Sequence, residues 1–238
     1  MNYKVAAFRS YIWRAFTHCS SRSYFRKKKQ HEQEPKWDDI RTYPYHRKTK
    51  ETLFSALKIY GSTGKLLNSI ESLYSRSLTA VRVDGVTGKW FDVNTGVRQG
   101  CKLSPLLFLI YMDKIVKDSK FIADVRVGEA NISSLLYADD MVLISKSFHS
   151  LQCNLDQLTR TCEEYGMRIN VEKSKSMVVG RKPVQTKCVV EGKELEQVPD
   201  FSYLGTVISG DGKLDGDLDN RICKAVKVCS QLYKAIFN

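Results

Sequence analysis

The 238-residue sequence is 42% hydrophobic and 11% aromatic, enough to bury a sizeable core, which excludes a globally disordered chain. Its formal net charge of +12 favours a polyanionic partner, because clustered lysine and arginine side chains gain free energy by releasing counterions from phosphates. Much of the excess lies near the start, where residues 1–50 contain 13 lysines and arginines against four acids.

The seven cysteines form no Cys-x-x-Cys pair, and the four histidines join no metal-ligand spacing. This pattern argues against a zinc site or a disulfide frame and indicates reduced thiols in an intracellular compartment, the cytoplasm or the nucleus. No apolar run approaches the roughly 20 residues that span a bilayer, so no membrane segment is predicted. The first 30 residues contain no acid, which is also typical of a mitochondrial presequence, and that alternative stays open.

The predicted elements, in chain order, begin with a basic amphipathic helix over residues 1–25 and a polar, basic linker over residues 26–50. Apolar spacing then predicts helices over residues 53–59 and 66–74, because side chains three and four positions apart share one helix face. Alternating apolar and polar residues over 79–83 and again from Trp90 predict a hairpin.

Pro105 suits the first helical position, so the next helix is predicted over residues 106–116. Two short β-prone runs, residues 135–137 and 141–144, flank Ala138-Asp139-Asp140 closely enough to predict a tight hairpin. The remaining predicted elements are a helix over 151–165, strands over 176–179, 187–190 and 203–208, and a last helix over 217–237.

The adjacent carboxylates of Asp139 and Asp140 lie between two hydrophobic strands, where like charges repel. A divalent cation would relieve that repulsion, and oxygen ligands select Mg²⁺ or Mn²⁺. Ions of this kind support nucleotidyl transfer. Aspartates are also common in ordinary turns, so this motif is weak by itself.

The segment from Gly96 to Pro105 adds a second candidate site. Its glycines allow the backbone to approach a ligand, while Arg98 and Gln99 offer hydrogen-bond donors. Ser104-Pro105 opens a helix whose N-terminus favours an anion such as a triphosphate. An ordinary loop with a helix cap is the simpler alternative.

Four motifs occur in one order: Gly96–Phe108, Tyr137–Asp140, Gly166–Ser174 and Phe201–Gly205. Together they resemble the ordered motifs of the reverse transcriptases of non-LTR (LINE-type) retrotransposons. The resemblance implies an α/β fold of the α+β kind, a truncated polymerase palm with an antiparallel sheet and packed helices over residues 51–210. It also implies that residues 211–238 form the helix that enters a thumb.

The resemblance implies a role for each matching residue. Asp139 and Asp140 match the catalytic, metal-binding pair, and Lys173 matches a lysine proposed to protonate the leaving pyrophosphate. The positions that match nucleotide and template contacts are Gly96, Arg98, Gln99, Gly100, Ser104, Pro105 and Tyr137, and those that match the primer grip are Tyr203, Leu204 and Gly205. The implied cofactor is Mg²⁺ or Mn²⁺, and the implied partners are an RNA template, a DNA primer and deoxynucleoside triphosphates.

One motif of the family has no recognisable copy here. The family places an Asp-x-x-Lys-Ala-Phe-Asp strand directly before the helix that is predicted near Glu51, and its first aspartate completes the metal site. Asp39 lies near the expected distance, but Pro44 interrupts a strand there. Two functions therefore remain open: an RNA-directed DNA polymerase, and a catalytically inactive remnant that binds nucleic acid.

Overall fold

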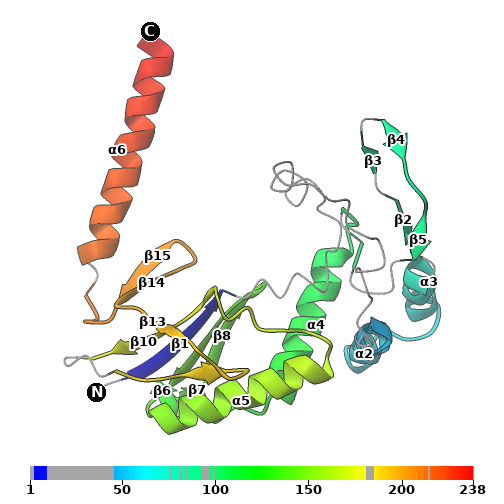
Figure 1. Cartoon of the computed structure of the whole chain (residues 1–238), viewed down its shortest axis with the longest axis horizontal. Helices are drawn as coiled ribbons and strands as arrows, with labels where there is room; N and C mark the ends of the chain where they lie inside the picture. Colours follow the sequence, from blue (N-terminus) through cyan, green and yellow to red (C-terminus); the bar gives the residue numbers. More distant parts are fainter. Residues whose placement is uncertain are drawn as a thin grey trace, which may run out of the picture. The chain divides into compact units, whose positions relative to one another are not determined.

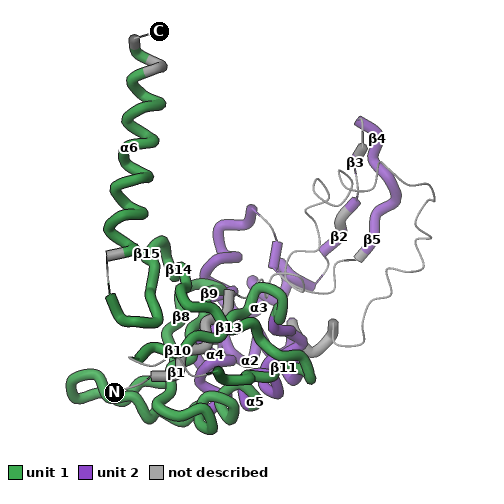
Figure 2. The backbone as a smooth tube through the Cα atoms, turned by 60° about the vertical axis from the view of Figure 1, so that its left-hand side comes forward, with its two compact units in different colours: residues 1–10, 121–156, 170–238 green, residues 11–120, 157–169 purple. Residues whose placement is uncertain are grey.

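Two compact units make up the chain (Figure 2). Unit 1 comprises residues 1–10, 121–156 and 170–238, and unit 2 comprises residues 11–120 and 157–169. The structure, a computed structural model, describes residues 3–9, 46–75, 77–80, 82–83, 85–92, 97–98, 100–180, 185–213 and 215–237.

Unit 1 is built on a five-stranded sheet with the order β13-β10-β1-β9-β8 (Figure 1). Its strands are β1 (Tyr3–Arg9), β8 (Ser134–Tyr137), β9 (Asp140–Ser145), β10 (Ser174–Val179) and β13 (Glu196–Gln197). Neighbouring strands are antiparallel except for β10 and β13, which are parallel. The mixed helix-and-strand fold agrees with the α+β class expected from the sequence.

The predicted N-terminal helix is wrong for residues 3–9, which form the central strand β1. Seven residues are too few to separate a helical from an extended apolar pattern, and pairing on both sides gives residues 4–8 backbone partners in two neighbouring strands. β1 pairs with β9 on one side and with β10 on the other, both far away in sequence. The rest of the predicted helix, residues 10–25, lies outside the described residues.

The two faces of the unit 1 sheet carry different residues along β9. Met141, Leu143 and Ser145 alternate along β9 and are fully buried. The first part of helix α5 (Phe148–Glu164) belongs to the same unit, and the Nδ2 of its Asn154 donates to Ser145 Oγ on this face at 3.3 Å. Because side chains alternate across a strand, Asp140 lies on the other face.

The described part of unit 1 also contains three short hairpins and a long C-terminal helix. They are β6 (Val125–Val127) with β7 (Ala130–Ile132), β11 (Val189–Val190) with β12 (Lys193–Glu194), β14 (Asp200–Tyr203) with β15 (Thr206–Ser209), and α6 (Asp215–Phe237). The single strand predicted over residues 203–208 is thus two strands joined by a turn, and the strand predicted over 187–190 is reduced to Val189–Val190. Among the helices that the structure describes, none combines the length and the apolar character needed to cross a membrane.

Among its described residues, unit 2 contains three helices and two short ladders. They are α2 (His46–Ile59), α3 (Gly64–Ser75), α4 (Ser104–Asp118), β2 (Leu78–Thr79) with β5 (Phe91–Asp92), and β3 (Arg82–Val83) with β4 (Val86–Thr87). The predicted helices and hairpin are therefore confirmed. Helix α2 begins at His46, so the last five residues of the predicted linker are helical, and residues 26–45 lie outside the described part of the chain.

Packing in unit 2 explains where these helices lie. Helix α2 contacts both α3 and α4, and its Leu53, Ala56 and Leu57 are buried. Tyr111 of α4 is also buried and donates a hydrogen bond from its hydroxyl group to the backbone oxygen of Tyr165. The predicted apolar faces of α2 and α3 are therefore buried in part: Leu67 and Ile70 of α3 also lie in the core, whereas Ile59 and Leu66 are exposed.

Candidate functional site

The two adjacent aspartates lie at the hairpin turn between β8 and β9. Tyr137 pairs with Asp140, so Ala138 and Asp139 form a two-residue turn, as the sequence predicts. Ala138 has φ +53°, whereas Asp139 is not among the positive-φ residues, which is the φ pattern of a type II′ turn. Both aspartates are partly exposed, so their carboxylates lie near the surface.

Two further predicted residues lie at the same end of unit 1. Lys173 directly precedes Ser174, the first residue of β10, and Ser174 pairs with Phe8 of β1. The residue that follows Phe8 pairs with Asp140, so Lys173 and Asp140 lie at the same end of the sheet. The pKa of Tyr203 is raised, first by burial and then by the negative charge of Asp140. The structure therefore gathers Tyr137, the aspartate pair, Lys173 and Tyr203 around one end of the sheet.

The predicted primer grip is the turn of the β14–β15 hairpin. Tyr203 pairs with Thr206, and the two residues between them, Leu204 and Gly205, have φ values of +50° and +86°. Positive φ at both positions matches a type I′ turn. Leu204 is 51% exposed although it is apolar and occupies a conformation that costs a non-glycine residue about 1–2 kcal/mol.

A buried carboxylate joins this hairpin to the last helix. The Asp217 side chain accepts hydrogen bonds from the Val207 backbone N–H at 2.8 Å and from Arg221 Nε at 2.7 Å. Arg221 also donates to Thr206 Oγ1 at 3.0 Å. The bond from Val207 lowers the pKa of Asp217; burial opposes this effect and Arg221 adds to it. Asp217 therefore fixes the start of α6 against β15.

The predicted nucleotide loop belongs to unit 2, and its described residues form a hydrogen-bonded turn. Ser104 Oγ donates to the Arg98 backbone oxygen and lies 3.1 Å from the Tyr74 hydroxyl oxygen. Arg98 Nε donates to Ser77 Oγ at 3.2 Å, and Gly100 has φ +81°.

The hydroxyl of Ser104 therefore shapes the loop, and its contact with a nucleotide stays a prediction. Pro105 lies in the first turn of α4, as expected. Gly96 and Gln99 lie outside the described residues.

The oxygen ligands of Asp139 and Asp140 fit a divalent cation in kind. A site for two such ions requires more ligands, and no group of three or more His, Cys, Asp or Glu residues suited to a metal occurs among the residues that the structure describes. Asp39, the candidate third carboxylate, lies outside the described residues. Among the described residues, Asp139 and Asp140 are therefore the candidate ligands for such an ion.

The structure adds one residue that the sequence did not single out. Arg9, the last residue of β1, is the register partner of Asp140. The apolar run Val5–Phe8 could have indicated a strand. Nothing in the sequence could have indicated its partner, because the register joins segments about 130 positions apart.

Comparison with protein families identifies the family to which this chain belongs. Residues 46–208 match the family described as reverse transcriptase (RNA-dependent DNA polymerase). The chain belongs to the reverse transcriptase family. The matched range contains the Arg98–Pro105 loop, the aspartate turn and the Tyr203–Gly205 turn, so the predicted sites lie within the family's own region.

Relatives in retrotransposons support this assignment. The chain is 25% identical over 173 residues to the Pol polyprotein of the type-2 retrotransposable element R2DM of Drosophila melanogaster, which covers 68% of this chain and 16% of the relative. It is 28% identical over 161 residues to an R2 Pol polyprotein of Nasonia vitripennis, covering 63% of this chain and 16% of that relative. The chain thus spans about a sixth of the length of these relatives.

A solved structure shares the fold. A structure of apo telomerase from Candida tropicalis, truncated from its C-terminal domain, superposes with a TM-score of 0.53 at 16% sequence identity. The similarity covers 90% of this chain and 35% of the telomerase chain. The fold of the chain is therefore that of a polymerase palm region, as the motifs predicted.

Proposed function

We propose that this chain is a reverse transcriptase-like protein whose palm binds an RNA template paired with a DNA primer. The observation that carries the proposal is the aspartate turn, which ends a two-stranded hairpin of the palm sheet inside the family's matched range. The retrotransposon relatives support the same function. Deoxynucleoside triphosphates are the expected second ligand.

In this proposal, different residues of unit 1 have different roles. Leu204 and Gly205 form an exposed turn that contacts the primer strand, and Asp217 and Arg221 fix the base of that turn. Lys173 adds a positive charge at the end of the sheet that carries Asp140. For nucleotide addition, the primer hydroxyl would lie near this end of the sheet.

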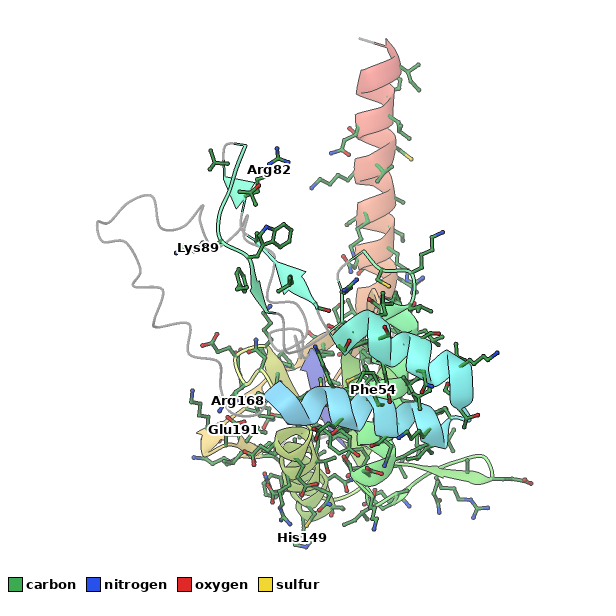
Figure 3. The ribbon with its side chains drawn as sticks, turned by 90° about the vertical axis from the view of Figure 1, so that its right-hand side faces the viewer. Phe54, Arg82, Lys89, His149, Arg168 and Glu191 are labelled. Carbon is green, nitrogen blue, oxygen red and sulfur yellow. The ribbon has the colours of Figure 1, made fainter. Side chains whose placement is uncertain are left out.

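A hairpin of unit 2 offers a second nucleic-acid contact. Trp90 is 67% exposed, and the basic residues Arg82 and Lys89 on the same hairpin are exposed as well (Figure 3). Aromatic side chains stack on bases and basic side chains neutralise phosphates, so this combination favours single-stranded nucleic acid. We expect the template strand to contact this hairpin.

Asp139 and Asp140 would hold a divalent cation, Mg²⁺ or Mn²⁺. When bound, such an ion activates the attacking hydroxyl and neutralises charge on the phosphates. The chain itself presents two carboxylates on a turn close enough to Tyr203 for Asp140 to act on its pKa. Tyr203 stays protonated at neutral pH, since its pKa is raised.

Fluorescence anisotropy with a labelled RNA template–DNA primer tests the proposal. The full chain should bind the hybrid, and Trp90→Ala should weaken binding several-fold because base stacking is lost. The matched control is Ile59→Ala, which removes an equally exposed side chain, 67%, from α2. Failure of the folded chain to bind any primer–template at low salt would contradict the proposal.

A further inference from the structure

The inference concerns the surface of helix α5, in the part of the helix that belongs to unit 1. His149 lies in the first turn of α5 and projects outward from it, and Cys153 follows about one turn later (Figure 3). The Cys153 Sγ and His149 Nε2 atoms are 3.7 Å apart in an exposed position. Residues four positions apart share one face of a helix, so a thiol and an imidazole meet there. Both are ordinary zinc ligands.

The distance between the two donor atoms fits a single metal ion. A tetrahedral Zn²⁺ binds an imidazole nitrogen at about 2.1 Å and a thiolate sulfur at about 2.3 Å, which places these two atoms about 3.6 Å apart. The observed 3.7 Å matches that value. The spacing His-x-x-x-Cys alone did not mark a zinc motif in the sequence. The helix and the orientation of the two side chains create the match.

The helix that carries the pair is anchored beside each ligand. Ser147 Oγ accepts a hydrogen bond from the Ser150 backbone N–H at 3.0 Å, which caps the start of α5. One turn later, the Gln152 side chain donates to the backbone oxygen of Val189 at 2.8 Å and accepts from its N–H at 3.0 Å. Ligands on an anchored helix lose less conformational freedom when they bind an ion.

We propose that His149 and Cys153 form a binding site for a borderline-soft divalent cation, Zn²⁺ or the similar ion Cd²⁺. The protein ligands are His149 Nε2 and Cys153 Sγ, and water fills the remaining positions. On binding, the Cys153 thiol loses its proton to solvent, and the neutral imidazole keeps its hydrogen on Nδ1. Asp156 lies three residues past Cys153 and adds a negative charge nearby.

This site differs in chemistry from the aspartate turn. Carboxylate oxygens select Mg²⁺ or Mn²⁺, whereas a thiolate and an imidazole select softer ions. Because the chain supplies two ligands here, the ion exchanges with solvent more readily than an ion in a four-ligand structural site. The site therefore binds zinc reversibly at the start of α5.

Titration of the full chain with Cd²⁺ tests the site, because a thiolate ligand gives an ultraviolet charge-transfer band that carboxylate ligands do not give. His149→Ala leaves every thiol in place. It should nevertheless weaken binding at Cys153 at least about tenfold, since the second ligand acts at a high effective concentration. Cys153→Ser should remove this part of the band. Zn²⁺ should also raise the Tm of the unchanged chain more than that of either variant.

Cys229→Ser is the matched control. Cys229 is also a free cysteine on an exposed helix, but the residues four positions away on either side are Ala225 and Tyr233, which carry no nitrogen or sulfur donor. The strong Cd²⁺ binding of the unchanged chain should persist in this variant. Equal Cd²⁺ affinity in His149→Ala and Cys229→Ser would overturn the proposal, because the 3.7 Å contact would then be an S–H···N hydrogen bond only.

A third variant keeps the test decisive if Cys153→Ser does not fold. Cys153→His places two imidazoles four positions apart on one helix face, a spacing that also binds zinc. This variant should keep the Zn²⁺-dependent rise in Tm and lose the thiolate band. Loss of the rise in Tm would overturn the proposal. None of these measurements uses nucleic acid, so the result is independent of primer–template binding.

Discussion

Tyr137 and Asp140 are register partners across the β8–β9 hairpin, which leaves Ala138 at φ +53° as the first residue of a two-residue turn. Alanine is strained in this region because its Cβ crowds the neighbouring carbonyl oxygen. The strained backbone and the aspartate pair therefore occur together, as is common where a turn serves a site.

Substitutions at Ala138 should reveal that strain. Ala138→Gly removes the Cβ and should leave the free energy of unfolding unchanged or raise it by up to about 1 kcal/mol. Ala138→Val adds a branched side chain and should lower it by about 1–3 kcal/mol. Urea unfolding measures both. Equal stability of the Val variant and the unchanged chain would show that φ is not positive here.

Leu204→Asn should separate stability from binding. Asn-Gly is the preferred type I′ pair, so the variant should raise the free energy of unfolding by about 1 kcal/mol. It also removes an exposed apolar side chain from the proposed primer contact, and affinity for the primer–template should fall. Leu135→Asn, which changes an exposed leucine away from that turn, is the control for binding. A more stable variant that binds equally well would exclude Leu204 from the primer contact.

The Asp217 network should make the junction of β15 and α6 sensitive to acid. The pKa of Asp217 is lowered in the folded chain, chiefly by the Val207 N–H. Its stabilising effect is therefore complete above the unfolded pKa of about 3.9 and is lost as pH falls through the lower folded value. Asp217→Asn should be less stable than the unchanged chain at pH 7, and the difference should shrink toward pH 2. A difference that does not depend on pH would contradict this role.

Nucleic-acid binding should depend steeply on salt. Neutralising the four basic residues Arg26–Lys29 should reduce the slope of log affinity against log salt concentration by about three to four for a duplex, because each phosphate contact contributes about 0.9. Their contribution follows from charge alone, since they lie outside the described residues. Affinity that does not change with salt would rule out this role.

The chain by itself should not extend a primer on an RNA template with Mg²⁺ or Mn²⁺. In-line transfer requires ions fixed within a fraction of an ångström, and a misplacement of about 1 Å costs on the order of a hundredfold in rate. The register partner of Asp140 on β1 is Arg9, so that position of the neighbouring strand supplies no carboxylate. Extension that is abolished by Asp139→Asn would contradict this expectation, and Asp39 would then be the first residue to test as a third ligand.

Local patterns predicted most of the helices and the aspartate turn. The apolar spacing of Leu53 and Leu57 marked α2, and Pro105 marked the start of α4, because both signals act within one or two helical turns. The turn at Ala138-Asp139 followed from its two β-prone flanks. Features that depend on neighbouring residues were therefore readable from the sequence.

The strand at Tyr3–Arg9 was not readable, because its conformation is decided by partners far along the chain. Val5 to Phe8 fit either a short helix or a strand, and only β9 and β10 select the strand. The opposition of Arg9 and Asp140 depends on that same pairing. The local composition does not reveal a register that distant strands determine.

The central position of β1 also bears on how the chain folds. Its partners on either side lie between Asp140 and Val179, so the sheet closes only when segments more than a hundred residues apart in the sequence come together. Such pairing raises the contact order and slows folding. Until β1 inserts, β9 and β10 each present an unpaired edge, and open edges of this kind promote aggregation between chains. Deletion of the first ten residues should therefore yield chains that associate in solution.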